Sequence, residues 1–258
     1  MSTGIKKIIA TKSRVVIPRH AVRVTLIIPP RTETTLEINS DHRHLKTLTV
    51  IINPGASLSL IQNFSADVPQ ELNEHIVVGS RATLTYVAIH KLRGVSNFRC
   101  LIEHQKAARS NVRLALAGKK QARNSTTVVS SLNAADSQST VLVLAAASDQ
   151  AQLDISANIA IGQRAELAVA DLSLHALLLS PQAVVELTPK MEIKNSTVVA
   201  AHRATVSRFD PLEKFYLHSR GLTTRKAEAV LTNNFFSRLV DTLSLEMAKK
   251  IIPALKIL

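Results

Sequence analysis

The stretch that decides the fold lies near the end of the chain: Pro189-Lys-Met-Glu-Ile-Lys-Asn-Ser-Thr-Val-Val-Ala-Ala-His-Arg-Ala-Thr-Val-Ser-Arg-Phe-Asp-Pro-Leu-Glu-Lys-Phe-Tyr-Leu-His-Ser-Arg-Gly221. Its hydrophobic period changes part-way through. Up to about Phe209 the apolar residues form short runs typical of β-strands, whereas after Pro211 they recur at helical spacing. The change predicts a β domain over residues 1–210 and a helical segment over 211–258.

The helical spacing continues through Leu212, Phe215, Tyr216, Ala227, Val230, Leu231, Phe235 and Leu239. Thr223 and Thr224 are candidate N-caps, because a hydroxyl accepts hydrogen bonds from the free N–H groups of a first turn. We expect one helix from about Arg225 to Ala248, with Pro253 marking its end.

In the β region, a small or polar turn that often contains Ala leads repeatedly into an alternating strand. The copies begin at Pro54, Gly79, Asp149, Gly162 and Ser180. Neighbouring copies are about 13 to 25 residues apart, with one longer gap, which suits degenerate turns of a solenoid. Before them, 22–38 and 45–52 are expected to be extended, with a polar turn over 39–42 between them and a break at Pro29-Pro30.

Composition favours a solenoid. Hydrophobic residues make up 46% of the 258 residues and aromatic residues only 3%, with no Trp and 7 Gly, so the core must be aliphatic and tight glycine hairpins are disfavoured. We therefore predict a mainly β protein, a right-handed parallel β-helix with a C-terminal helical segment. A β-sandwich is the structural alternative.

The formal charge is +13. Such a charge suggests an anionic partner or simply a solvated basic surface. The basic residues are scattered and are not interleaved with aromatic residues, so nucleic acid is an unlikely partner. A basic β-solenoid module that binds nucleic acid or another polyanion remains the alternative function.

The cellular setting is expected to be the cytoplasm. The chain has one cysteine, so an intramolecular disulfide cannot form. Its N-terminus lacks the pattern of a signal peptide, and no apolar run has the length of a membrane span.

Few residues are candidates for chemistry. Sequence motifs for phosphate loops, Cys-x-x-Cys pairs and zinc proteases are absent. His42 and His44 could form a metal pair but are more typical of exposed turn residues, and Cys100 is expected to be a buried thiol.

His202 lies in an apolar run, where a polar imidazole requires either a hydrogen-bond partner or a function. It is either a core-edge histidine that the backbone satisfies or a ligand for a metal or persulfide at a subunit surface. His175 has the same ambiguity.

Three segments carry a family resemblance. They are Leu177-Leu-Leu-Ser180 followed by Ala183, Thr188-Pro-Lys-Met-Glu-Ile193, and Ala201-His-Arg-Ala-Thr-Val206 followed by Phe215-Tyr-Leu-His-Ser-Arg-Gly221. Their order and spacing resemble the core of the SufB/SufD proteins, the scaffold subunits of Suf iron–sulfur cluster assembly, and lean towards SufD.

The resemblance implies a non-catalytic scaffold that pairs with a SufB-like subunit or with itself. It further implies a SufC-type ATPase docked through the C-terminal helices, and a transient iron–sulfur cluster with no permanent cofactor. His202, and His175 less directly, would lie at the cluster-assembly interface, with His202 the candidate metal ligand. Phe215, Tyr216, Arg220, Phe235 and Phe236 would belong to the ATPase-docking surface.

Two departures from the family pattern stand out. Arg203 follows the signature histidine where relatives carry Gly or Glu, and Ser207 replaces the Gly after Thr-Val. The resemblance does not account for the charge of +13. An enzyme acting on acidic polysaccharide is a rival reading, but it would need a cluster of carboxylates or basic residues on one solenoid face, and the sequence shows none.

Overall fold

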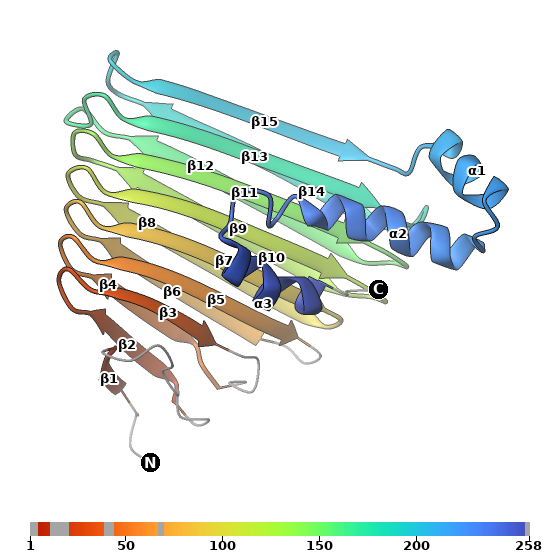
Figure 1. Ribbon diagram of the computed structural model, residues 1–258, viewed down its shortest axis with the longest axis horizontal. Helices are drawn as coiled ribbons and strands as arrows, with labels where there is room; N and C mark the ends of the chain where they lie inside the picture. Colours follow the sequence, from red (N-terminus) through yellow and green to blue (C-terminus); the bar gives the residue numbers. More distant parts are fainter. Residues whose placement is uncertain (1–4, 11–20, 39–43, 67–69, 256–258) are drawn as a thin grey trace.

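The chain forms two stacked parallel sheets with three helices after them (Figure 1). The structure is a computed structural model that describes residues 5–10, 21–38, 44–66 and 70–255. The turn predicted at residues 39–42 lies outside the described residues.

Sheet A has eight strands: β1 (Ile5–Ile9), β2 (Arg23–Ile28), β4 (Thr47–Ile52), β6 (Gln70–Val78), β8 (Val95–His104), β10 (Arg123–Leu132), β12 (Gln152–Ile161) and β14 (Val184–Ile193). Sheet B has seven: β3 (Glu33–Ile38), β5 (Ser57–Ala66), β7 (Thr83–Leu92), β9 (Arg109–Gly118), β11 (Gln138–Ala147), β13 (Val169–Leu178) and β15 (Val199–Ser207). The helices are α1 (Pro211–Ser219), α2 (Thr224–Ser237) and α3 (Leu245–Leu255).

From β2 onward, successive strands alternate between the two sheets, and each strand pairs in parallel with the strand two places along the chain. Ser57 pairs with Thr83 and Thr83 with Arg109, so one full turn here takes 26 residues. The result is a β-solenoid of about six turns. The mainly β fold predicted from sequence is confirmed, and the β-sandwich is excluded because all the strand pairings are parallel.

Alternation along each strand builds the core. In β8 and β10 every second side chain is buried, because successive residues of a strand point to opposite faces. The inward residues form one aliphatic column that includes Leu58, Leu84 and Val112 from sheet B. Small Ala side chains fill the corners where the chain turns, among them Ala82, Ala122 and Ala151.

The turns explain the scarcity of glycine. Left-handed backbone occurs at Arg81, Lys120 and Asp149, with φ values of 58°, 59° and 55°. This conformation is uncommon in residues other than glycine, and the ladder hydrogen bonds on either side of each turn hold it in place. Such turns leave no Asn-Gly or Asp-Gly signature in the sequence.

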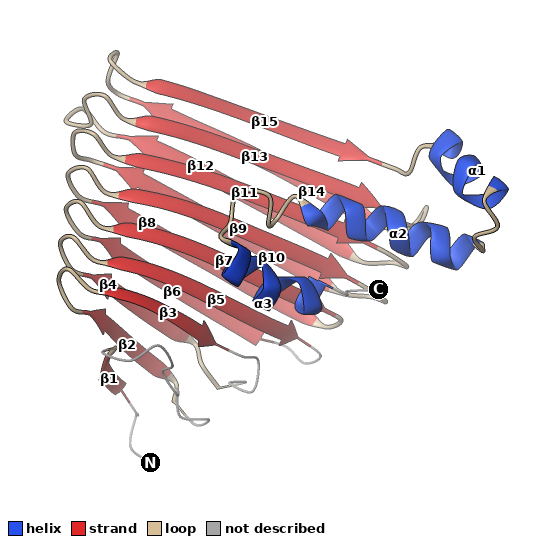
Figure 2. Cartoon of the chain, in the orientation of Figure 1, coloured by secondary structure: helices blue, strands red, loops and turns tan. Residues whose placement is uncertain are grey.

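Helices α2 and α3 lie along the outer face of sheet B (Figure 2). Phe236, Leu239 and Ile251 share a hydrophobic cluster with outward residues of sheet B such as Val87 and Leu144. For this reason β7, β9 and β11 have consecutive buried residues instead of strict alternation. The helices therefore cover the flank of the solenoid.

The prediction of one helix from Arg225 to Ala248 was wrong. The Thr223 side chain accepts a hydrogen bond from the N–H of Lys226 and caps α2 as expected, but α2 ends at Ser237. The break is stabilised from the sheet, because the Arg113 guanidinium donates to the carbonyls of Arg238 and Leu239 at 2.9 and 3.0 Å. These helix-end carbonyls would otherwise lack partners.

Pro253 was expected to mark the end of the helix, but it lies inside α3. It is close enough to the C-terminus of α3 that its missing N–H interrupts little of the helix. Among the described residues, none of the helices has both the length and the apolar character needed to cross a membrane.

Candidate functional site

The last turn of the solenoid is open. β14 and β15 are the terminal strands of their sheets, so each has a sheet partner on one side only. Their inward side chains continue the core column: Val185, Leu187, Pro189, Met191 and Ile193 from β14, and Ala200, His202, Ala204 and Val206 from β15. All of them are partly or fully exposed, because the next turn that would cover them is missing.

His202 belongs to this open end. It pairs in register with Leu172, a fully buried core residue of β13, so it stands on the inward side of sheet B. The side chain is nevertheless exposed. His202 therefore presents an exposed imidazole on the inward side of a mainly apolar, uncovered end of the core.

His175 lies on the other face of sheet B. It pairs with Thr205, and its Nε2 lies 3.1 Å from Nη2 of Arg238, the residue that follows α2. Partial burial lowers the pKa of His175, and the nearby Arg238 and Arg203 guanidinium groups lower it further. A neutral imidazole can accept the Arg238 hydrogen bond through Nε2. The sequence paired His175 with His202, but the structure separates them across a sheet.

Arg203, the departure from the family pattern, also faces outward. Its Nη2 donates to Oδ1 of Asp171 on β13 at 2.9 Å. Both side chains are substantially exposed, so this ion pair adds little stability. It places a positive charge beside His175, which is consistent with the lowered pKa.

Within the described part of the chain, no group of three or more His, Cys, Asp or Glu side chains is arranged to hold a metal ion. Cys100 is fully buried, as expected. His44 is exposed, and His42 falls outside the described residues, so the possible pair is not tested.

Helix α1 presents the second unusual surface. None of its residues is buried, and Leu212, Phe215 and Tyr216 are 74%, 71% and 57% exposed. Arg220 packs over the Tyr216 ring, with its guanidinium carbon 5.4 Å from the ring centroid. Figure 1 shows α1 projecting beyond the end of β15. An apolar helix face of this kind is typical of a docking surface.

The other two aromatic candidates are placed differently. Phe236 is fully buried against sheet B and Phe235 is partly buried beside it, with ring centroids 5.2 Å apart. In this conformation Phe236 holds α2 on the sheet and offers no surface to a partner.

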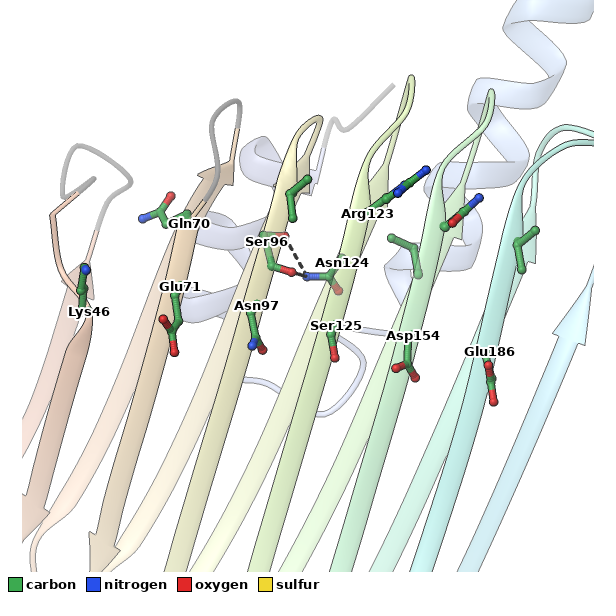
Figure 3. Close-up of a pocket in the computed structure, with 14 residues that line it drawn as sticks. Lys46, Gln70, Glu71, Ser96, Asn97, Arg123, Asn124, Ser125, Asp154 and Glu186 are labelled. Carbon is green, nitrogen blue, oxygen red and sulfur yellow. Dashed lines mark hydrogen bonds between the residues drawn. The ribbon is translucent and has the colours of Figure 1, made fainter.

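The sequence reasoning did not anticipate a groove of about 730 Å³ across the outer face of sheet A (Figure 3). Glu71, Asn97, Ser125, Asp154 and Glu186 form one row across five strands, each in register with the next. Alternation places these side chains outward. Only knowledge of the turn lengths would have aligned them, because they are far apart in sequence.

Comparison with known proteins identifies the family. The family model described as "SUF system FeS cluster assembly, SufBD core domain" matches residues 9–235. The chain belongs to the SufBD family. The matched span includes the whole solenoid from β2 to β15 and the helices α1 and most of α2.

Individual relatives agree with this assignment. The chain is 35% identical over 86 residues to iron–sulfur cluster assembly protein SufD of Bacillus subtilis (strain 168), covering 33% of this chain and 20% of the relative. It is 22% identical over 209 residues to SufB of the same organism, covering 80% and 45%. SufD of Escherichia coli (strain K12) is 30% identical over 103 residues, covering 40% and 24%.

These matches also bear on the kind of SufBD protein. The shorter, more identical segments match SufD, whereas the long match is to SufB, so the lean towards SufD is slight. The aligned part spans less than half of each of these curated relatives.

Proposed function

We propose that this chain is a non-catalytic scaffold subunit of Suf iron–sulfur cluster assembly. It would pair through the open end of its β-helix with a second SufB/SufD-like subunit, or with a copy of itself, and dock a SufC-type ATPase through its C-terminal helices. The observation that supports the proposal most directly is the uncovered last turn formed by β14 and β15.

The open end suits pairing with a similar solenoid. The side chains of Ile193 and Val206 lie on the inward faces of their sheets, yet each is 48% exposed. An edge strand with unpaired backbone groups and apolar side chains is a template for another strand. A partner of the same fold would extend both sheets and bury the exposed end of the core.

His202 would then lie within the paired interface. A neutral imidazole is a ligand for iron and other transition metals. His202 alone would leave most ligands to be supplied by the partner or by the cargo. The iron–sulfur cluster is accordingly a transient cargo here and not a resident cofactor.

The docking role rests on α1. Its exposed Leu212, Phe215 and Tyr216 lie on a helix that projects from the solenoid and has no buried residue of its own. Lys214 of α1 is 2.8 Å from Glu228 of α2, which fixes α1 to the helix packed on sheet B. An ATPase bound to α1 would therefore be connected through α2 to sheet B.

Docking is tested with purified SufC-type ATPase from the same genome. The double variant Phe215→Ala/Tyr216→Ala should lose ATPase binding in a pull-down, because it removes most of the exposed apolar area of α1. Leu245→Ala, an equally exposed apolar residue on α3, is the matched control and should bind normally. Full binding by the double variant would remove the docking role.

Pairing is tested separately on β15. Val206→Lys places a charge on the inward side of the open end, where a paired core would exclude it. Thr205→Lys places the same charge on the outward side one residue away. Analytical ultracentrifugation, alone and with a SufB-like subunit, should show the complex for Thr205→Lys and its loss for Val206→Lys. Equal behaviour of the two variants would exclude pairing through this end.

A further inference from the structure

A cluster of basic side chains lies where the strands of sheet B end. Lys91 and Arg93 come from the end of β7 and the turn after it, and Lys119 and Lys120 from the turn after β9. Arg225 is added by the first turn of α2. We call these five residues the basic rim. Figure 1 shows α2 beginning on the side of the molecule where the odd-numbered strands end.

The members of the rim repel one another. The pKa of Lys119 is lowered first by partial burial and then by the positive charges of Arg93, Arg225 and Lys91, while Asp149 opposes the shift. The Asp149 carboxylate also accepts a hydrogen bond from the backbone N–H of Lys120 at 2.7 Å. Three positively charged side chains thus repel Lys119, and one carboxylate attracts it.

The start of α2 adds to the positive potential. The N-terminus of a helix carries a partial positive charge that acidic residues in the first turn normally offset. The first turn of α2 has no acidic residue and contains Arg225 and Lys226 instead. Folding therefore brings positive charges together at this rim, and an anionic partner surface would reduce the repulsion between them.

The rim adjoins the apolar face of α1. The helix carrying Arg225 is the one that holds α1, through the 2.8 Å contact between Glu228 and Lys214. Only four residues separate the end of α1 at Ser219 from the start of α2 at Thr224. A partner seated on α1 would consequently have the basic rim beside it.

We propose that the basic rim and α1 form one docking surface, whose protein partner carries an acidic patch next to an apolar groove. The inference rests on the proposed function, since it names the charge that the ATPase surface must carry where it meets the rim. An acidic protein surface is favoured over nucleic acid, because the adjoining exposed face is an apolar helix with Leu212 among the aromatic residues. A phosphate backbone has no counterpart for such a face.

The test measures association rates of the full chain with the SufC-type ATPase by surface plasmon resonance, from about 50 to 300 mM salt. The wild-type rate should fall steeply with salt. Lys119→Glu/Arg225→Glu should associate about tenfold or more slowly at low salt and lose most of the salt dependence, because steering acts mainly on the association rate. Lys106→Glu/Arg164→Glu makes the same change of charge at exposed turns at the other ends of the strands and should behave as wild type.

Three results would overturn the inference. One is an unchanged rate for the rim variant with wild-type ATPase binding intact, which leaves the proposed function standing. Another is an equal fall in the association rate for the control variant, which would show that only the net charge of the protein matters. The third is binding of a labelled 20-nucleotide single-stranded DNA that depends on the rim while ATPase association does not. If wild-type protein fails to bind the ATPase at any salt, the proposed function fails instead.

Discussion

Glu74 of β6 and Tyr86 of β7 meet inside the solenoid, with the tyrosine hydroxyl 2.6 Å from Glu74 Oε2. Gln62 Nε2 donates to the other carboxyl oxygen at 2.7 Å. Both Glu74 and Tyr86 are buried, and burial raises the pKa of Glu74 to about 7, in spite of hydrogen bonds from Tyr86 and Gln62 that lower it. One carboxyl group buried inside the solenoid therefore titrates near neutral pH.

This carboxyl group predicts a pH dependence of stability. The unfolded chain ionises Glu74 near pH 4.5 and the folded chain near pH 7. Between these values the folded state holds the proton more tightly, so the free energy of unfolding should fall as pH rises and then level off. Glu74→Gln can satisfy the same partners, because its Oε1 can accept from Gln62 and its Nε2 can donate to the Tyr86 hydroxyl, which then donates to Gln62 Oε1. It should abolish this fall, and at about pH 8 it should be more stable on the order of 3 kcal/mol.

The free energy of unfolding of wild type and Glu74→Gln is measured by urea unfolding from about pH 4.5 to about pH 8. Glu71→Gln on the exposed face of the same strand is the control and should change the profile little. Parallel profiles for wild type and Glu74→Gln would contradict the prediction.

His90 of β7 predicts a loss of stability at acid pH. It is fully buried between Phe64 and Phe98, with ring centroids 4.8 and 4.6 Å away, and within the described residues neither ring nitrogen has a hydrogen-bond partner. Burial lowers its pKa to about 3. The unfolded chain therefore takes up this proton first as the pH falls below 6.5, so stability falls towards acid pH.

His90→Leu should reduce this loss of stability at acid pH. It should also stabilise the protein at neutral pH by roughly 1–3 kcal/mol, because a buried polar ring without partners is replaced by an apolar side chain of similar size. Thermal unfolding at neutral and acid pH measures both effects. A lower melting temperature at neutral pH would show that His90 makes an interaction that the geometry does not reveal.

Arg113 of β9 holds the helices on sheet B. It is buried, and besides the two helix-end carbonyls it donates to the Thr242 hydroxyl. Arg113→Met should cost about 2–4 kcal/mol, because the carbonyls of Arg238 and Leu239 lose a charged donor. Arg109→Met, on the same face of β9 but at its exposed start, should cost little. Limited proteolysis should cleave 211–255 faster in Arg113→Met alone, and equal cleavage rates would contradict the role.

His202→Ala tests the open end. Since the side chain is exposed, stability should stay within about 0.5 kcal/mol of wild type. Under the proposed function, cluster transfer to an apo-ferredoxin should fall several-fold when the variant replaces wild type in the reconstituted complex. Thr205→Ala on the opposite face of the same strand serves as control. A full yield of transferred cluster with His202→Ala would exclude the role.

The sequence carried less information about the site than about the fold. The exposed aromatic residues of α1 follow from the helical spacing after Pro211. The separation of His175 from His202 does not, because it depends on which face of sheet B each residue occupies. That face is set by register, and register depends on the length of each solenoid turn, which from β2 onward varies from 24 residues between Glu33 and Ser57 to 32 between Gln152 and Val184.

By itself, the sequence determined the stacked parallel strands, the break at Pro29-Pro30, the cap at Thr223 and the change to helix after Pro211. These features follow from local periods and from the few residues with special backbone preferences. Only the tertiary structure decided that α2 and α3 cover sheet B and leave the last turn open, and that the five basic residues of the rim lie together. The physical reason is that these outcomes arise from interactions between residues far apart in sequence, which no local pattern encodes. Examples are the hydrogen bond from Arg113 to the Leu239 carbonyl and the electrostatic repulsion between Lys119 and Arg225.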